Sequence, residues 1–421
     1  MIRIIKADGT AEREQIASMR SRAAEVGADI ERAVGAVMQD VREKGFSAVE
    51  KYSLQFDRKA PYEIGMETLE EAYARCTGGL ISAMEHAAAN IRDYNEALLA
   101  TSREWISPDG GIVGRVVRGL TRVGLYVPGG TAAYPSSVLM NAIPAKVAGV
   151  KELIMVTPPT ENLNDAVLAA AKIAGVDRVI AVGGAQAVAA LAYGAGFIPK
   201  VDKLVGPGNA YVAAAKRMAY GTLDIDMVAG PSEVLVIADE SADPKYVAAD
   251  LLSQAELASS VLLTTSQGLA TRVDAEIIRQ TSYLGRSEII AASLRDFGCA
   301  IVCRDLKQAA ELANEVAPEH LEIVTEDPRS LLPDIQNAGA VFLGAWSPEP
   351  LGDYLAGPDH VLPTSGTARF FSPLSVDSFL KTMSVVEFSR ETLAPIREEI
   401  VTMAEAEHLT AHANSIRVRF E

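Results

Sequence analysis

The sequence predicts an α/β protein with two parallel-sheet lobes and helical extensions at its two ends. The chain has 421 residues, of which 49% are apolar, so two or more domains with well-buried cores are expected. From about residue 121 onward, short apolar runs that end in glycine turns alternate with alanine-rich stretches at helical spacing. Such strand–glycine–helix units in series indicate parallel sheets covered by helices.

Helices are expected before and after this region. Between Asp29 and Gly45 the apolar residues repeat at helical spacing, and the glycine is a suitable helix end. The last fifty residues are expected to be helical again, from about Ser375 to Ser415.

Two series of strands are expected between the helical ends. The first series comprises RVGLYV, KELIMV, DRVIAV and VDKLV, and the second comprises SEVLVIAD, SVLLTT, CAIVCRD, LEIVTED and NAGAVFLG. No low-complexity stretch or obvious linker separates them, so an interleaved arrangement of the two lobes is allowed.

The charge and the cysteine content argue against several classes of function. A formal net charge of −16 repels a polyphosphate backbone, so no nucleic-acid partner is expected. Three cysteines give no disulfide framework, and Cys299 and Cys303 are expected to be small apolar side chains on one face of a strand. There is no signal-peptide pattern and no apolar run of about 18 residues, so we expect a cytoplasmic protein without membrane partners.

Glycine turns mark places where a ligand can approach the backbone. In open α/β sheets ligands bind beyond the carboxyl ends of the strands, where Gly129–Gly130, Gly183–Gly184 and Gly206–Gly208 are expected. Backbone N–H groups in such turns can contact a cofactor. None of the turns has the G-x-G-x-x-G spacing of the usual dinucleotide motif, so a plain tight turn explains each about as well.

Histidine is scarce, and one of the five histidines follows a glutamate at the entrance to an expected strand. Glu319 and His320 in this position suit proton transfer, because imidazole titrates near neutral pH, but a packed histidine explains the pattern equally well. His86 is expected at the surface of a helix.

The other histidines are ambiguous on spacing alone. His360 lies in a Gly/Pro-rich segment with Asp353 and Asp359, which is either a functional loop or a turn-rich connection. His408 and His412 share one face of an expected helix. That spacing can bind a metal, although two solvated histidines are the simpler interpretation.

Nine segments, in order along nearly the whole chain, resemble the histidinol dehydrogenase family. The resemblance implies two Rossmann-like lobes of the aldehyde-dehydrogenase-like type and a cytosolic enzyme of histidine biosynthesis. It implies that L-histidinol is oxidised to L-histidine in two NAD-dependent steps through an enzyme-held aldehyde. The segments are GLYVPGGTA, VGGAQAVAALAYG, KLVGPGNAYV, IDMVAGPSEVLVIADE, DLLSQAE, APEHLEI, NAGAVFLG, WSPEPLGDYLAGPDHVLPT and EHLTAH.

The expected domain division has four parts. Residues 1–25 are expected to form an N-terminal arm, and residues 26–120 and 233–372 a discontinuous catalytic lobe. Residues 121–232 are expected to form the NAD-binding lobe, and residues 373–421 a helical dimerisation segment.

The resemblance also assigns roles to residues that match the family motifs. His320 is the general base for the alcohol proton, and Glu319 activates the water that attacks the aldehyde. Tyr126, Gln186 and Asn209 contact NAD. The expected substrate contacts are Ser232, Gln254, His320, Asp353, His360, Glu407 and His412.

The family holds its substrate with one zinc ion, and one of the four expected protein ligands is missing here. Gln254, Asp353 and His412 stand at three ligand positions. The sequence reads SQAELASS, so that Leu257 replaces the expected histidine and about three residues are absent. Leucine has no lone pair, so weaker zinc binding is expected.

Three explanations of this departure are open. The residues are truly deleted, His408 or Glu256 supplies a substitute ligand, or the sequence joins two segments across a loop. A peptide bond between Glu256 and Leu257 distinguishes the last explanation from the others.

The resemblance implies a homodimer with shared active sites, in which Glu407 and His412 come from the partner chain. Two alternative functions accompany the first one. These are a related NAD-dependent dehydrogenase for another small polar alcohol, and a non-catalytic NAD-binding paralogue. The second alternative is favoured if Glu319 and His320 lie far from the glycine turns.

Overall fold

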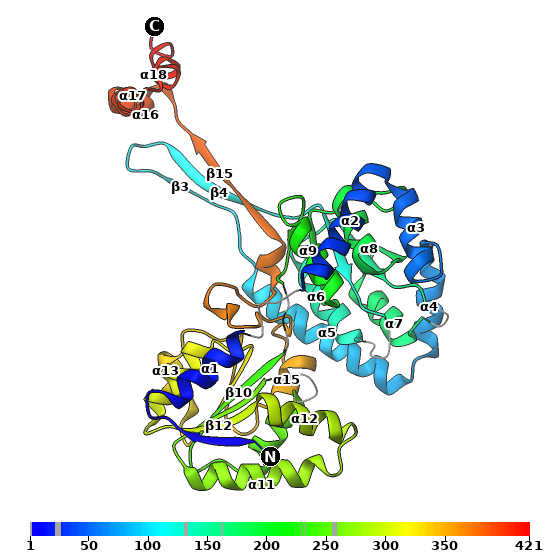
Figure 1. Ribbon diagram of the computed structural model, residues 1–421. Helices are drawn as coiled ribbons and strands as arrows, with labels where there is room; N and C mark the ends of the chain where they lie inside the picture. Colours follow the sequence, from blue (N-terminus) through cyan, green and yellow to red (C-terminus); the bar gives the residue numbers. More distant parts are fainter. Residues whose placement is uncertain are drawn as a thin grey trace.

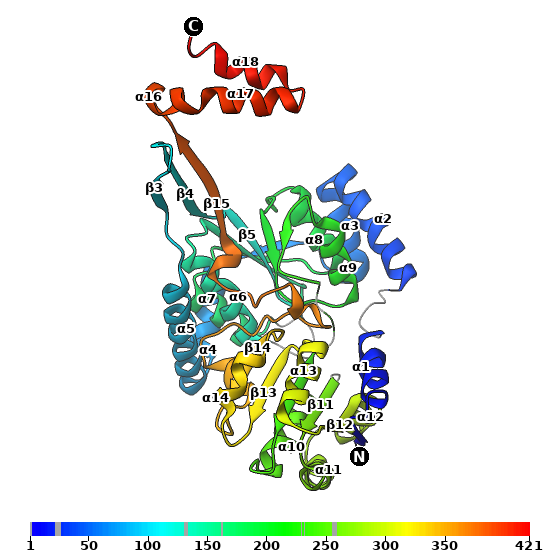
Figure 2. The ribbon, with the colours of Figure 1, turned by 90° about the vertical axis from the view of Figure 1, so that its left-hand side faces the viewer.

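The computed structural model describes residues 2–21, 27–129, 134–160, 163–228, 230, 232–254 and 259–421. These residues form two α/β lobes and a projecting arm that carries the C-terminus (Figures 1 and 2). Each lobe contains one six-stranded sheet, and the arm contains a three-stranded sheet. The expected α/β architecture is therefore confirmed. Within the described part of the chain, no helix has the length and apolar character needed to cross a membrane.

The first lobe is built on a sheet with strand order β2-β7-β6-β5-β8-β9. Neighbouring strands are parallel, except that β2 is antiparallel to β7. In β6, Leu153 and Met155 belong to one hydrophobic cluster and Ile154 and Val156 to another, because successive side chains point to opposite faces. The strands are β2 (Tyr62–Ile64), β5 (Arg122–Tyr126), β6 (Glu152–Thr157), β7 (Arg178–Ala181), β8 (Lys203–Val205) and β9 (Asp224–Ile225).

Helices cover both faces of this sheet. One cluster contains the apolar residues of α4 to α7, and the other contains those of α2, α3, α8 and α9. The helices are α2 (Ala28–Lys44), α3 (Phe46–Phe56), α4 (Met66–Arg75), α5 (Gly78–Leu98), α6 (Pro135–Val147), α7 (Asp165–Ala174), α8 (Gly184–Tyr193) and α9 (Ala210–Ala219).

The second lobe is built on an all-parallel sheet with strand order β1-β12-β11-β10-β13-β14. In the central strand β10, Val234 and Val236 face one hydrophobic cluster, and Leu235 and Ile237 face the other. The strands are β1 (Arg3–Lys6), β10 (Glu233–Ala238), β11 (Ser259–Thr264), β12 (Gly298–Val302), β13 (His320–Val324) and β14 (Ala340–Leu343).

The helices of the second lobe also form two layers. Residues of α10, α11 and α12 pack in one cluster, and residues of α1, α13 and α14 pack in the other. Cys299 and Cys303 both lie in the second of these clusters, so their expected common face is confirmed. The helices are α1 (Ala11–Ser21), α10 (Pro244–Ser253), α11 (Gln267–Thr281), α12 (Ser287–Phe297), α13 (Leu306–Val316), α14 (Pro328–Leu331) and α15 (Glu349–Tyr354).

The structure corrects the expected assignment of residues 26–120 to the second lobe. Helices α2 to α5 pack on the helices of the first lobe, and β2 pairs with β7 of its sheet through Tyr62 and Ala181. The apolar stripe of α2, which includes Val34 and Val41, is buried against the alanine-rich α8 and α9. Periodicity predicts such a stripe but does not identify its partner.

The expected separate N-terminal arm also differs from the structure. Arg3–Lys6 forms the edge strand β1, which is parallel to β12, and α1 packs near α13. These first residues therefore complete the second lobe.

The projecting arm combines two segments that lie far apart in the sequence. Strand β15 (Leu380–Glu387) is antiparallel to β4 (Ile112–Gly119), which pairs in turn with β3 (Arg103–Ile106). A strand at Leu380–Glu387 contradicts the expectation that the chain is helical from about Ser375 to Ser415, because cross-strand pairing along the whole of β15 favours extended backbone. The arm ends in the helices α16 (Arg390–Leu393), α17 (Arg397–Ala406) and α18 (Thr410–Arg417).

Candidate active site

The two lobes meet through the loop that follows α15, which lies between them (Figure 1). The Nδ2 atom of Asn90, on α5 of the first lobe, donates a hydrogen bond of 2.8 Å to the carbonyl of Leu355. Ser137, on α6, lies with its Oγ 3.2 Å from Nε2 of His360. The start of α6 therefore lies beside the Gly/Pro-rich segment of the second lobe.

Glu319 and His320 stand at the amino end of β13, as the sequence predicts, and both bind the backbone of one residue on β10. The amide of Glu233 donates to Oε2 of Glu319 at 2.9 Å, and its carbonyl lies 3.1 Å from Nδ1 of His320. A carbonyl only accepts, so Nδ1 carries the ring hydrogen and Nε2 holds the lone pair of the neutral imidazole. The hydrogen bond between Nδ1 and the Glu233 carbonyl therefore leaves Nε2 as the basic atom of the imidazole.

Burial sets the protonation of this pair. The side chain of His320 is 4% exposed, and removal of water from the imidazolium lowers the pKa of His320. Burial likewise raises the pKa of the Glu319 carboxyl well above its ordinary value, against the hydrogen bond from the Glu233 amide. At neutral pH the imidazole is therefore neutral, as a base must be.

Further carboxylates surround the free nitrogen of His320. Oε1 of Glu349 lies 3.7 Å from Nε2, and Asp353 stands one helical turn further along α15. Glu322 accepts a hydrogen bond of 2.8 Å from the amide of Glu349. Burial raises the pKa of Asp353 to about 8, with a further contribution from Glu349. Burial and Asp250 together raise the pKa of Glu322 to about 9.

His360 lies next to this cluster, as expected for a substrate contact. Its Nδ1 is 3.1 Å from the carbonyl of Asp353, and its Nε2 faces Ser137. Burial lowers the pKa of His360 to about 4. Both ring nitrogens therefore have partners, in contrast to His320.

The three expected NAD contacts lie at the carboxyl edge of the first sheet. The hydroxyl of Tyr126, at the end of β5, accepts a hydrogen bond of 3.0 Å from the amide of Gly184. Nε2 of Gln186 donates to Asp57 at 3.2 Å. Asn209 caps α9 and accepts from its first amides. Burial raises the pKa of Tyr126 to about 12, so its phenol is neutral.

One glycine beside these residues, Gly206, cannot be replaced by a residue with a side chain without strain. Gly206 has φ +107°, and a Cβ there would meet the carbonyl oxygen of Tyr126 at 2.2 Å. Its amide donates to Asp226, which also pairs with the buried Lys216. This turn after β8 is thus held close to the end of β5.

Not all expected site residues come together within one chain. Glu407 follows α17 and His412 lies in α18, both exposed at the end of the arm and remote from both lobes (Figures 1 and 2). Gln254 caps the end of α10, and the carbonyl of Ser232 accepts from the amide of Ser259. A peptide bond between Glu256 and Leu257 distinguishes the explanations of the missing zinc ligand, but both residues lie outside the described part of the chain.

Several residues of the cluster were not expected from the sequence. The resemblance assigns no role to Glu349, Glu322, Asp250 and Glu233, although all four lie in segments that carry it, and Glu349 stands four residues before Asp353. Residues four apart share a helix face, and this spacing was the available signal.

The cluster has the donor atoms that a divalent cation requires. Ligand atoms of His320, Glu349 and Asp353 all lie within 4.8 Å of one another. Imidazole nitrogen and carboxylate oxygen are common ligands of zinc and of manganese. The residues therefore fit a metal ion.

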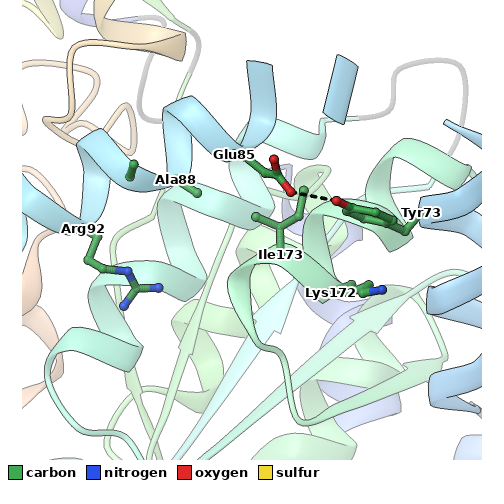
Figure 3. A pocket seen from close by; sticks show the side chains of 7 residues that line it. Tyr73, Glu85, Ala88, Arg92, Lys172 and Ile173 are labelled. Carbon is green, nitrogen blue, oxygen red and sulfur yellow. Dashed lines mark hydrogen bonds between the residues drawn. The ribbon is translucent and has the colours of Figure 1, made fainter. Parts of the chain in front are cut away.

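A hollow of about 450 Å³ lies on the outside of the first lobe, but its polar side chains do not gather around one point as the cluster does. There the Tyr73 hydroxyl donates to Glu85 at 2.7 Å and Lys172 lies over the Tyr73 ring, whereas Arg92 lies apart from them (Figure 3). The polar groups share no centre, so this hollow is not the candidate site.

Two parallel-sheet lobes that meet at a buried histidine–carboxylate cluster define a two-lobed α/β enzyme equipped for acid–base chemistry. A family model described as histidinol dehydrogenase matches residues 20–420. A histidinol dehydrogenase from Clostridium acetobutylicum is 51% identical over 429 residues, covering 100% of this chain and 99% of the relative. Another, from Caldanaerobacter subterraneus, is 54% identical over 401 residues and covers 93% of each chain.

A solved structure agrees with these sequence relatives. The crystal structure of histidinol dehydrogenase from Elizabethkingia anophelis has a TM-score of 0.93 and 35% identity, covering 100% of this chain and 98% of that chain. The chain belongs to the histidinol dehydrogenase family and is an oxidoreductase.

Proposed function

We propose that the enzyme oxidises L-histidinol to L-histidine through L-histidinaldehyde, with Glu319 and His320 as its catalytic residues. The observation that carries this proposal is the buried pair in which Nε2 of His320 has no hydrogen-bond partner among the described residues and lies 3.7 Å from Oε1 of Glu349. The overall reaction converts one alcohol and one water into a carboxylate, with the removal of two hydrides, which NAD accepts when bound, and three protons.

His320 acts in the first oxidation. Its neutral Nε2 accepts the hydroxyl proton of the alcohol, so that the carbon can release a hydride and become an aldehyde. The carbonyl of Glu233 holds the opposite nitrogen at 3.1 Å and keeps Nε2 directed at the substrate. NAD, when bound, supplies the hydride acceptor in both oxidations.

Glu319 acts in the second oxidation. As a carboxylate it accepts a proton from the water that attacks the aldehyde carbon, and the resulting hydrate releases the second hydride. Because burial raises the pKa of the Glu319 carboxyl well above its ordinary value, the ionised form that this step needs becomes more abundant as the pH rises, so the step should become faster at higher pH.

NAD binding is assigned to Tyr126, Gln186 and Asn209. Their position at the carboxyl edge of the first sheet, beside glycine turns, supports this assignment. Zinc is assigned to Gln254, Asp353 and His412, and when bound it holds the substrate through imidazole and amine groups. The fit of Asp353 within the carboxylate cluster supports the zinc assignment.

The active site is proposed to be shared between two copies of the chain in a homodimer. Glu407 and His412 lie at the end of an arm remote from their own lobes, so a second copy supplies them. The arm also exposes large apolar side chains, including Trp105 at 55% and Val386 at 71% exposure, as an unpaired interface does. The cytoplasm is the proposed compartment.

The decisive experiment measures NADH formation from L-histidinol after chelation, with and without added Zn²⁺. Turnover that depends on Glu319 and His320 is expected. Leu257 favours one second candidate, a related dehydrogenase for another small polar alcohol, because it removes a residue that holds the imidazole of histidinol. NADH formation with other amino alcohols but none with L-histidinol would establish that candidate and refute the first.

A further inference from the structure

The histidines of the chain cannot replace the missing zinc ligand within one subunit. The sequence has five histidines; His86 is exposed on α5, and His408 and His412 are on the arm. Both ring nitrogens of His360 have partners at 3.1 and 3.2 Å. His320 is the proposed base. The lobes must therefore offer a cation oxygen ligands.

The burial and the hydrogen bonding of Glu349 make it suitable as such an oxygen ligand. Its side chain is 2% exposed, and its Oε2 accepts a hydrogen bond of 3.0 Å from the hydroxyl of Ser253. Its Oε1 has no hydrogen-bond partner among the described residues, and the same holds for Nε2 of His320. Unsatisfied polar atoms this deeply buried are rare, and an ion is one of the groups that satisfy them.

Glu349 lies close to one expected metal ligand, Asp353, and binds the residue that precedes another, Gln254. Oxygen atoms of Glu349 and Asp353 lie within 4.8 Å of each other and of a ring nitrogen of His320. Ser253, which holds the other oxygen of Glu349, directly precedes Gln254 at the end of α10. The buried carboxylate of Glu349 and the partly buried carboxylate of Asp353 repel each other at this separation unless a cation or a proton lies between them.

We propose that Glu349 is a metal ligand in this chain and that it takes the place of the imidazole absent at Leu257. The cation is then held by Glu349, Asp353 and the amide oxygen of Gln254, with His412 of a second copy as the single imidazole. The inference rests on the proposed function, in which a cation holds the substrate.

This donor set changes which cation the site retains. Oxygen ligands suit hard cations such as Mn²⁺, whereas imidazole favours Zn²⁺. A site in which a carboxylate replaces one imidazole should therefore have a smaller ratio of Zn²⁺ affinity to Mn²⁺ affinity.

The test measures metal affinity directly on the chelator-stripped full-length protein. Zn²⁺ and Mn²⁺ are titrated against a chromophoric chelator, and the rise in melting temperature on adding each metal is recorded. Glu349→Gln keeps the shape of the side chain but removes its charge, and it should weaken binding by at least roughly tenfold. Glu85→Gln, which removes the same charge from the outer hollow of Figure 3, should bind metal like the wild type.

The metal-free melting temperature separates ligation from a structural role. If Glu349 is a ligand, the metal-free Glu349→Gln protein melts at or above the wild-type temperature and loses the metal-induced rise. Wild-type affinity in Glu349→Gln overturns the inference. Lower stability of the metal-free variant together with lost binding also overturns it, because a damaged fold explains both.

The proposed function is tested by a different measurement from the one that tests the metal site. Absence of NADH formation from L-histidinol by the metal-loaded wild type refutes that function, yet Glu349-dependent binding would still support the metal site. Normal turnover by a wild type whose metal affinity does not depend on Glu349 refutes the metal site alone.

Discussion

Two inactive variants should restore each other's activity if the arm of one chain completes the site of another. Glu319→Gln removes a residue of the lobes, and His412→Ala removes a residue at the end of the arm. In a mixed dimer one site carries both lesions, and the other site carries neither. Each variant alone has a lesion in every site.

The expected recovery follows from counting sites. When the two variants are co-expressed in equal amounts, about half of the dimers are mixed and half of their sites are intact, which gives about one quarter of wild-type activity. The assay is the rate of NADH formation from L-histidinol per mole of chain.

A matched pair of variants controls for mixing itself. Glu319→Gln and His360→Ala both lie in the lobes, so every site of their mixed dimer carries one lesion and no activity should return. Recovery by this control pair, or no recovery by the first pair, would refute the shared site. Full turnover by a monomeric form would refute it as well.

Three further predictions concern proton transfer and stability. The rate of L-histidinaldehyde oxidation should rise with pH as Glu319 ionises, because burial raises the pKa of that carboxyl; a pH–rate profile that Glu319→Gln leaves unchanged would contradict the assignment. The metal-free protein should lose stability as pH rises from about 5 to 9, because Glu322, with its pKa raised to about 9, holds a proton in the folded state that the unfolded chain releases at its ordinary value of 4.5. Urea unfolding across this range should show a shallower decline for Glu322→Gln, and an unchanged slope would count against the effect. Asp226→Ala should cost about 3–5 kcal/mol in urea unfolding, because it leaves the buried Lys216 without its partner, whereas a loss below about 1 kcal/mol would show that Lys216 reaches water.

The repeating part of the fold could be predicted from the sequence because its signals are local. The strand Glu152–Thr157 contains four consecutive apolar residues, LIMV, and the glycine after Ala174 ends its helix in the left-handed conformation. The assignment of α2 to α5 could not be predicted in this way. Their apolar stripes fit any apolar surface, and only the packed tertiary structure selects α8 and α9 for α2.

The residues of the site likewise fall into those that a local sequence signal predicts and those that only the tertiary structure brings together. Glu319 and His320 could be predicted because they are adjacent at a strand entrance, so that one local segment places both. Glu349 reaches the same point from a separate helix, and nothing in its own segment indicates the distance of 3.7 Å to His320. The strand at Leu380–Glu387 was missed because its partner β4 lies in a distant part of the chain.

The pairing of β15 with β4 also dictates the order in which the molecule can be made. Strands β3 and β4 leave the ribosome long before β15, the strand that completes their sheet. In the same way, the first strand, Arg3–Lys6, joins a sheet whose adjoining strand β12 is made much later. Domains generally fold as units during synthesis, so the first lobe can form on the ribosome, whereas the sheet of the arm must wait until β15 has also been made.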